Sequence, residues 1–328
     1  MEEKVFETIK KYNLIENGDK IVCGVSGGPD SISMLDILRK IKEEKRINFE
    51  IYVAHINHMI REESTDDEEY VENYCKKYNI QFFCKRAKVQ EIASENKIGT
   101  EEAGRNVRYE FFEEIQNQKN ANKIAIAHNK NDKIETIIMH MLRGSGLSGL
   151  EGIKPIRDQK YIRPLIECER AEIENYCEEN ELHPRIDRTN FENEYTRNKI
   201  RNIVIPYIKQ EFNPNIIETV NRLSQVITEE NEFFNKIVQE AYGKVVIEEK
   251  NDQIILKLKE FNELEKTIKK RLILYVTKRL KGSSKGVEMI HIEDIIKLCN
   301  NNIGNKFLTP NKNLKILVKD KKIFFISK

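Results

Sequence analysis

Apolar runs alternate with amphipathic stretches through the first two thirds of the chain, which is the pattern of an α/β fold. The apolar runs predict strands at residues 21–25, 49–56, 80–84, 123–127 and 161–165. Between them, apolar residues recur every three or four positions and predict helices at residues 5–12, 30–44, 61–78, 100–118, 134–142 and 170–180. This alternation predicts a parallel, Rossmann-like sheet with right-handed crossovers and helices on both faces. The apolar side of the helix at 134–142, which includes Met141 and Leu142, is expected to be buried.

Residues 212–215, with the sequence Phe-Asn-Pro-Asn, form the clearest predicted linker, because a proline there separates two helical runs. This linker divides the chain into an expected first domain, residues 1–212, and a smaller, mainly helical second domain, residues 213–328. In the second domain we expect helices at 216–242, 266–281 and 292–299, strands at 245–248 and 254–258, and a terminal hairpin at 315–326.

Composition and charge narrow the class of protein. Charged residues make up 34% of the 328 residues, and no apolar run reaches the roughly 20 residues that span a membrane. The N-terminus does not have the pattern of a signal peptide, so a cytoplasmic protein is expected. From residue 251 to 328 there are 18 Lys and Arg residues against 8 Asp and Glu residues. That bias is typical of a nucleic-acid contact, and equally of a lysine-rich solvated surface.

The six cysteines argue against a metal cluster. None of them forms a CxxC pair, the spacing that zinc and iron–sulfur sites commonly use. Most are therefore expected to be small core residues in a reducing compartment.

A glycine turn joins the first predicted strand to its helix. Its sequence is Ser26, Gly27, Gly28, Pro29, Asp30 and Ser31. A strand, a glycine turn and a helix N-terminus direct free backbone N–H groups at an anion, and glycine permits both a positive φ and close approach. The serines add hydroxyl donors, and the Asp30 carboxylate can hold a metal such as Mg²⁺ beside phosphates. The Walker and GxGxxG patterns are absent here. The turn thus predicts a nucleotide-phosphate loop; the alternative is an ordinary turn before a helix.

Polar residues follow the second and fourth predicted strands. Ligands of open α/β sheets bind outside the carboxyl ends of the strands, which brings His55, Asn57 and His58 near the predicted nucleotide; the alternative is that they cap the strand end without a ligand. His128 lies at the end of the fourth predicted strand. Asp132 and Glu135 are three apart at the start of the next helix and project together. They predict a cation-binding or acid–base pair, or else carboxylates that merely complement the helix dipole.

Two pairs of arginines have helical spacing. Arg105 and Arg108 are three apart, and Arg197 and Arg201 are four apart, so each pair shares one helix face. Two guanidinium groups on one face suit binding of phosphate. The alternative for each pair is ion pairing on a helix surface.

Seven motifs together resemble those of the tRNA(Ile)-lysidine synthetase family, within the PP-loop ATP pyrophosphatases. They are SGGPDS (26–31), HINHMIR (55–61), GRNVRYEFF (104–112), AHNKNDKIET (127–136), LRGSGLSGLEGI (142–153), RPL (163–165) and DRTNFENEYTRNKIR (187–201). The resemblance is specific over residues 1–210 and only architectural from residue 216 onward. It implies the adenine nucleotide α hydrolase-like version of the Rossmann-like fold.

The resemblance implies a two-step carbon–nitrogen ligase reaction. ATP and Mg²⁺ would adenylate the wobble cytidine of a CAU-anticodon tRNA(Ile), and free L-lysine would then displace AMP to give lysidine. This product changes codon specificity from AUG to AUA. A homodimer is compatible with the family resemblance. The rival hypotheses are another PP-loop enzyme that modifies tRNA, such as a thiolase, and a non-catalytic nucleotide- or RNA-binding module.

The resemblance also implies roles for individual residues. The loop 26–31 would bind phosphates, with Asp30 holding Mg²⁺, and the adenine pocket would be lined by Ala54, His55 and Ile56. Phosphate or cytidine would be bound by Arg105 and Arg108, and the proton of lysine would be accepted by Asp132 or Glu135. Arg201 would bind the adenylate or the tRNA, with His128 at the strand end. One departure affects the run after this histidine. Relatives usually have HHxDD there, whereas this chain has Asn129 and Asn131 in place of the second His and the first acid.

Overall fold

The computed structural model describes residues 1–59, 64–185, 195–301 and 306–327. These residues form two compact units, Met1–Ile227 and Thr228–Lys328. The division lies within helix α10 (Ile216–Val245), beyond the expected boundary at residue 212. Residues 60 and 61 of the HINHMIR motif and residues 187–194 of the last motif lie outside the described residues. None of the described helices is both long and apolar enough to cross a membrane.

A six-stranded sheet is the centre of the first unit, in the order β3-β2-β1-β4-β6-β5. Its strands are β1 (Lys20–Gly24), β2 (Glu50–Asn57), β3 (Gln81–Arg86), β4 (Lys123–Ile126), β5 (Ile156–Arg157) and β6 (Tyr161–Ile162). The first five strands in this order pair in parallel, as the alternation of strands and helices predicts. The edge strand β5 was not predicted, and it runs antiparallel to β6.

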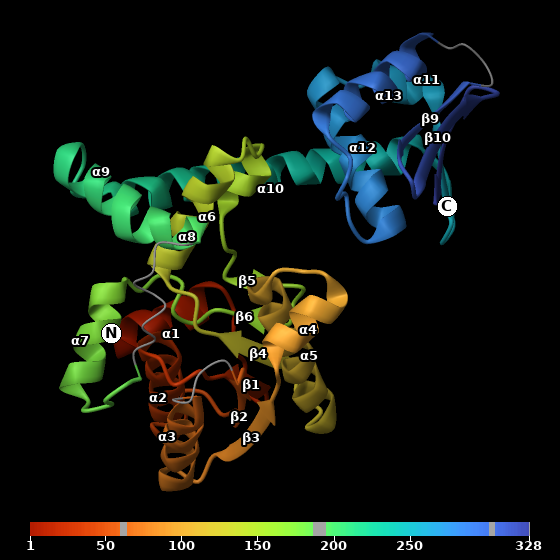
Figure 1. Cartoon of the computed structure of the whole chain (residues 1–328). Coiled ribbons are helices and arrows are strands. Elements are labelled where there is room, and N and C mark those ends of the chain that lie inside the picture. The colour runs from red at the N-terminus through yellow and green to blue at the C-terminus, as the bar shows by residue number, and fades with distance from the viewer. Residues whose placement is uncertain (60–63, 186–194, 302–305, 328) are drawn as a thin grey trace. The chain divides into compact units, whose positions relative to one another are not determined.

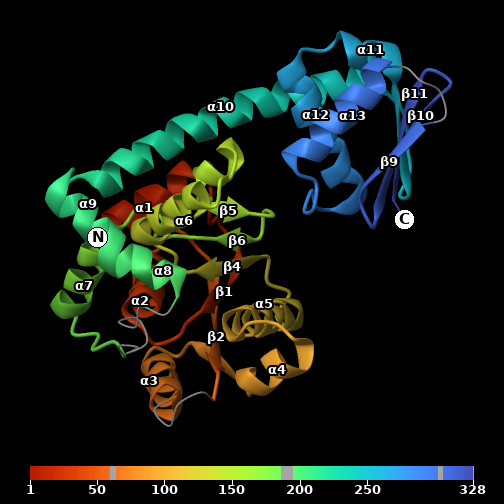
Figure 2. The ribbon, with the colours of Figure 1, turned by 45° about the horizontal axis from the view of Figure 1, so that its top comes forward.

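Helices cover both faces of this sheet (Figures 1 and 2). One face carries α1 (Glu2–Lys11), α2 (Pro29–Glu43), α3 (Ser64–Lys77) and α7 (Arg170–Glu179); the other carries α4 (Val89–Asn96) and α5 (Thr100–Gln118). Alternate strand residues supply the two cores, because successive side chains point to opposite faces. Cys23 packs with the first set of helices, whereas its neighbour Val22 packs with the second. Burial on both faces explains why the strands are apolar almost throughout.

Gly24 ends β1 and lies against Phe112 of α5. A Cβ atom at this position would lie 2.3 Å from Cζ of Phe112. Gly24→Ala is therefore expected to lower the free energy of unfolding by about 1–3 kcal/mol, as overpacking does in other cores. Thermal unfolding measures the change, and Phe112→Leu in the same background should recover part of it. Gly99→Ala is the control, because a Cβ there meets nothing within 4 Å; an equal loss in both variants would contradict this steric argument.

A third layer of the first unit consists of α6 and the segments that pack on it. They are α6 (Lys130–Leu142), the 3-10 turn η1 (Leu147–Glu151), α8 (Thr196–Lys199), the π-helical turn η3 (Ile200–Val204), α9 (Ile205–Glu211) and the start of α10. Ile134, Ile137 and Ile138 pack against isoleucines of the last three segments in that list. Pro206 has no N–H to donate to the carbonyl four residues earlier, which favours a wider helical turn before it.

One burial prediction for α6 is wrong. Met141 and Leu142 are 59% and 65% exposed, although they were expected on the buried side. The apolar cluster under α6 does not extend past Met139, so the last helical turn has no partner to cover it. The glycine-rich segment that follows α6 contains the 3-10 turn η1.

The second unit has an antiparallel sheet in the order β7-β8-β11-β10-β9. Its elements are the end of α10, β7 (Val246–Glu249), β8 (Gln253–Lys257), α11 (Leu258–Glu263), α12 (Lys266–Lys281), α13 (Met289–Asn301), β9 (Lys306–Asn311), β10 (Leu314–Lys319) and β11 (Lys322–Ser327). The predicted helix at 266–281 and the terminal hairpin are confirmed, whereas α11 and β9 were not predicted. Phe261 and Phe325 are fully buried in its core.

Candidate functional site

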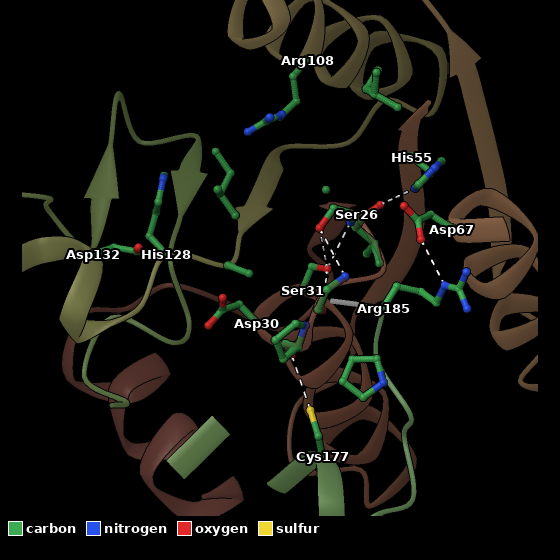
Figure 3. A pocket seen from close by; sticks show the side chains of 18 of the residues that line it. Ser26, Asp30, Ser31, His55, Asp67, Arg108, His128, Asp132, Cys177 and Arg185 are labelled. Atoms are coloured by element: carbon green, nitrogen blue, oxygen red, sulfur yellow. Dashed lines mark hydrogen bonds and ion pairs between the residues drawn. The ribbon is translucent and has the colours of Figure 1, made fainter. Parts of the chain in front are cut away.

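A cavity of about 920 Å³ opens at the carboxyl ends of β1, β2 and β4 (Figure 3). The chain adds β2 and β3 on one side of β1 and then crosses to the other side to form β4. Doubly wound folds bind their ligands at such a reversal of strand order. Most of the predicted site residues line the cavity: Ser26, Gly28, Pro29, Asp30, Ser31, Ala54, His55, Ile56, Arg108, His128, Asp132 and Arg201. Gly27, Arg105 and Glu135 do not line it.

The glycine turn has the geometry expected of an anion-binding loop. Gly27 has φ +90°, a conformation that side chains rarely adopt, and α2 begins two residues later at Pro29. The backbone N–H of Ser26 donates to Oγ of Ser31 at 3.1 Å, and that hydroxyl donates to the carbonyl of Gly28 at 3.1 Å. The segment after α7 closes over the turn, since the backbone N–H of Arg185 donates to the Gly27 carbonyl at 3.0 Å. These contacts fix the turn beside the N-terminus of α2.

Asp30 is a carboxyl group in an unfavourable environment for its charge. Burial, and secondly the negative charge of Asp132, raise the pKa of Asp30 to about 6. The Asn129 side-chain amide opposes this effect by donating to Oδ1 of Asp30 at 2.7 Å. A cation entering the cavity would therefore find two carboxylates that repel each other.

Asp30→Asn is expected to stabilise the ligand-free chain at high pH only. Since the pKa of Asp30 is about 6 when folded and ordinarily 3.8, the folded chain keeps a proton between about pH 4 and pH 6 that the unfolded chain loses. The parent therefore loses stability as pH rises through this window, by up to about 3 kcal/mol, whereas the variant does not. Thermal unfolding at pH 4, 6 and 8 tests this; an offset between the two proteins that is the same at every pH would contradict it.

Asp132 and Glu135 lie together, as their spacing predicts, but in different environments. Arg201 contacts both: its Nη2 lies 3.1 Å from Oδ1 of Asp132, and its Nε lies 2.7 Å from Oε1 of Glu135. Glu135 is only 1% exposed and also accepts from Nε of Arg197 at 2.9 Å. Glu135 thus binds two guanidinium groups without lining the cavity, whereas Asp132 lines the cavity.

The two asparagines that depart from the family pattern have defined contacts. Asn129 is the N-cap of α6, where its Oδ1 accepts from the Asp132 backbone N–H at 2.9 Å while its Nδ2 donates to Asp30. One amide can do both, since it carries an acceptor and a donor. Asn131 accepts from the backbone N–H of Arg170 at 3.0 Å and so joins α6 to α7. Both positions support the site's framework.

Three of the four histidines that line the cavity have pKa values below the ordinary range. Burial lowers the pKa of His55, whose Nδ1 lies 2.8 Å from the carbonyl oxygen of Val25. Burial, followed by the charge of Arg108, lowers the pKa of His58 to about 4. Burial and then Arg163 lower the pKa of His128 to about 3. They therefore act as hydrogen-bonding groups, not as cations, near neutral pH.

Sequence reasoning missed several cavity residues. Arg170, at the start of α7, lies 3.9 Å from Asp132, and Cys177 and Arg185 reach the cavity from the same part of the chain. Only the tertiary fold brings these residues to the strand ends. Arg163 lies within the RPL motif, which contributed to the family resemblance but did not predict a role for this residue.

Comparison with known proteins gives the family. A family model described as a PP-loop domain matches residues 1–208. The chain is 46% identical over 308 residues to the tRNA(Ile)-lysidine synthase of Clostridium acetobutylicum, covering 94% of this chain and 66% of that protein. With the enzyme of the same name from Clostridioides difficile it is 44% identical over 313 residues, covering 95% and 67%. The chain belongs to the tRNA(Ile)-lysidine synthase family of PP-loop proteins.

Two further findings qualify this membership. The chain spans about two thirds of the length of these family members. Among solved structures, the U34-tRNA thiolase NcsA from Methanococcus maripaludis, with its 4Fe–4S cluster, aligns with a TM-score of 0.58 and 20% identity, covering 70% of this chain and 77% of that one. At this identity the likeness concerns the fold alone.

Proposed function

We propose that this chain ligates free L-lysine to the wobble cytidine of a CAU-anticodon tRNA(Ile), with ATP as the activating nucleotide. The names of its relatives support the reaction class. The observation that carries the proposal is the single cavity that contains the glycine loop, Asp30, Asp132 and Arg201 together. One cavity with a phosphate loop, paired carboxylates and a guanidinium suits adenylation followed by attack of an amine.

The loop and the N-terminus of α2 would bind the β- and γ-phosphates of ATP. Backbone N–H groups at this position stabilise the negative charge that develops on departing pyrophosphate. The hydroxyl of Ser26 is directed at Oγ of Ser31, 3.1 Å away, and gains a second possible acceptor when phosphate enters. In the first step the cytidine O2 would attack the α-phosphorus, and pyrophosphate would leave.

The donor set fits Mg²⁺ in this site. Asp30 and Asp132 are close enough for the negative charge of Asp132 to raise the pKa of Asp30, and a divalent cation would remove that repulsion. The described residues contain no group of three or more metal-ligating side chains, so phosphate oxygens and water would complete the coordination, as is usual for Mg²⁺. When bound, the cation would neutralise charge on the pyrophosphate. Asp30 would hold it.

Asp132 is the better candidate for the group that deprotonates lysine. Both oxygens of Glu135 accept from arginines, and its side chain does not line the cavity. Asp132 lines the cavity and shares Oδ1 with Arg197 and Arg201 at 3.3 and 3.1 Å. In the second step the lysine amine would attack C2 of the cytidine, its proton would pass to Asp132, and AMP would leave. Arg201 would then be free to contact the leaving phosphate.

The test is incubation of the full chain with a CAU-anticodon tRNA(Ile) transcript, ATP and labelled lysine, with elongator tRNA(Met) as control. We expect label in the first RNA alone. ATP–pyrophosphate exchange that depends on the tRNA, without any transfer of lysine, would favour another PP-loop modification of tRNA. No exchange and no label would favour a binding module and overturn the proposal.

A further inference from the structure

Arg163 is a buried cation without a carboxylate beside it. Its side chain follows β6 and is only 4% exposed. Its hydrogen-bond partners are uncharged: Nη1 donates to the carbonyl of Lys154, and Nε donates to Nδ1 of His128 at 3.2 Å, with the side chain of Tyr109 as a further partner. Among the described residues, none of the ion pairs includes Arg163. Arginine remains protonated in proteins, so its charge stays in place.

This contact fixes the tautomer of His128. A guanidinium has only donors, so Nδ1 of His128 has to be the acceptor. The proton of the neutral ring therefore resides on Nε2. His128 lines the cavity, and among the described residues its side-chain hydrogen bond is the one that Nδ1 accepts from Arg163, which leaves Nε2 for a ligand. The ring presents an N–H donor to whatever occupies the cavity.

The surroundings of His128 are rich in positive charge. Arg105, Arg108, Arg163 and Arg197 all lie close enough to lower the pKa of His128, after burial. Arg108 lines the cavity, and Figure 3 shows it and His128 arising from ribbons other than the one that carries Ser26 and Ser31. A buried cation that lacks a counter-ion is unfavourable until an anion arrives. The ligand that fits has negative charge and oxygen acceptors.

We propose that Arg163 is a positioning residue that fixes His128 as an Nε2–H donor, and that this donor and Arg108 bind a phosphoryl oxygen. This site is distinct from the glycine loop, which takes the departing phosphates. The inference rests on the proposed function only for the source of the oxygen, which is either the α-phosphate of the nucleotide or an RNA phosphodiester. Binding of the α-phosphate would place charge-stabilising donors next to the reacting phosphorus, whereas binding of a phosphodiester would position the RNA.

Nitrogen NMR of the full chain, labelled with ¹⁵N-histidine, tests the tautomer between pH 5 and 9. His128 is expected to be the Nε2–H tautomer without titrating, with its signals assigned by their loss in His128→Asn. His55 and His140 are internal controls, because their Nδ1 atoms lie 2.8 Å from carbonyl oxygens and have to carry the proton. A protonated Nδ1 on His128, or a titration near pH 6.5, would overturn the proposal.

Variants of Arg163 test the positioning role. Arg163→Lys supplies another side chain with donors only and is expected to keep the tautomer, whereas Arg163→Met is expected to let both tautomers appear. If Arg163→Met does not fold, the tautomer of His128 in the parent and in Arg163→Lys still tests the role, because both are expected to show the Nε2–H form. Arg46→Met is the matched control, since Arg46 pairs with Glu3 and stacks on Phe6, away from the cavity. An unchanged tautomer in folded Arg163→Met would show that another group fixes the ring.

Three ligands then identify the source of the phosphoryl oxygen. A shift of the His128 Nε2 signal by AMP but not by adenosine indicates the nucleotide phosphate; a shift by an anticodon stem-loop RNA alone indicates a phosphodiester. No shift with any of them would overturn the anion site. Arg163→Met is expected to weaken the responding ligand roughly 10–100-fold, the usual effect of losing a hydrogen bond to a charged group. A response to AMP without any lysine transfer would sustain this inference and remove the proposed function.

Discussion

Asp132→Asn is expected to lower lysine transfer by about 10²–10⁴-fold, the usual contribution of a positioned general base. The amide keeps the size of the carboxylate and can still accept from the Asn129 backbone N–H, which donates to Oδ2 of Asp132 at 3.1 Å. It cannot take a proton from the amine. Turnover at saturating lysine, measured with labelled amino acid, gives the size of the effect, and nucleotide binding should change little.

Asp158→Asn is the control for this variant. Its side chain is 72% exposed and pairs only with its neighbour Arg157 among the described residues, so transfer should be unaffected. A variant at Asp132 that retained full turnover at saturating lysine would remove the assigned base. A rise in the KM for lysine alone would instead mean that Asp132 binds the ammonium group without accepting its proton.

Glu135→Leu is expected to lower the free energy of unfolding by about 3 kcal/mol, because it breaks a buried ion pair and leaves the partly buried Arg197 and Arg201 with Asp132 as their shared carboxylate. Glu135 is 1% exposed and accepts from both Arg197 and Arg201. The transition of the first unit in thermal or urea unfolding measures the loss. Adding Arg201→Leu should recover part of it, since two guanidinium groups would otherwise share the single carboxylate of Asp132.

Glu91→Leu is the matched control for Glu135→Leu. Its side chain is 63% exposed and pairs with Lys88 on the surface, so its change in unfolding free energy should stay within about 0.5 kcal/mol. If the variant at Glu135 were as mild as this control, or if the double variant were less stable than the single one, the proposed role of Glu135 as an anchor for the two arginines would be wrong.

Local features of the fold could be predicted because they depend on residues near one another in the sequence. The periodicity of residues 100–118 predicted α5 (Thr100–Gln118) with its observed ends, and the glycine turn was identified from one strand–turn–helix segment. The burial of Met141 and Leu142 was not predictable in this way. Periodicity indicates which side of a helix is apolar, but not how far along the helix its packing partner extends.

The site itself was predicted in part, because carboxyl ends of parallel strands meet at one edge of a sheet. What the sequence could not distinguish was the pair Asp132 and Glu135, which share a helix face but differ in depth. Likewise, the hydrogen bond from Asn129 to Asp30 joins residues 99 positions apart, so no local pattern contains it. The same holds for Arg163 and His128, whose contact depends on the neighbouring strands β6 and β4.

The π-helical turn at Ile200–Val204 has a consequence for how this region can evolve. Such a turn contains one residue more than an α-helical turn, and each residue rotates a helix by about 100°. Deleting Asn202 would return the turn to α-helical spacing and leave Ile205, now 6% exposed, against the isoleucines of α6, but it would change the turn whose residues Arg201 and Asn202 line the cavity. A substitution in this turn changes a single side chain, whereas an insertion or deletion changes the backbone of the whole turn. Homologous chains are therefore expected to vary in composition across this turn but to keep its residue count.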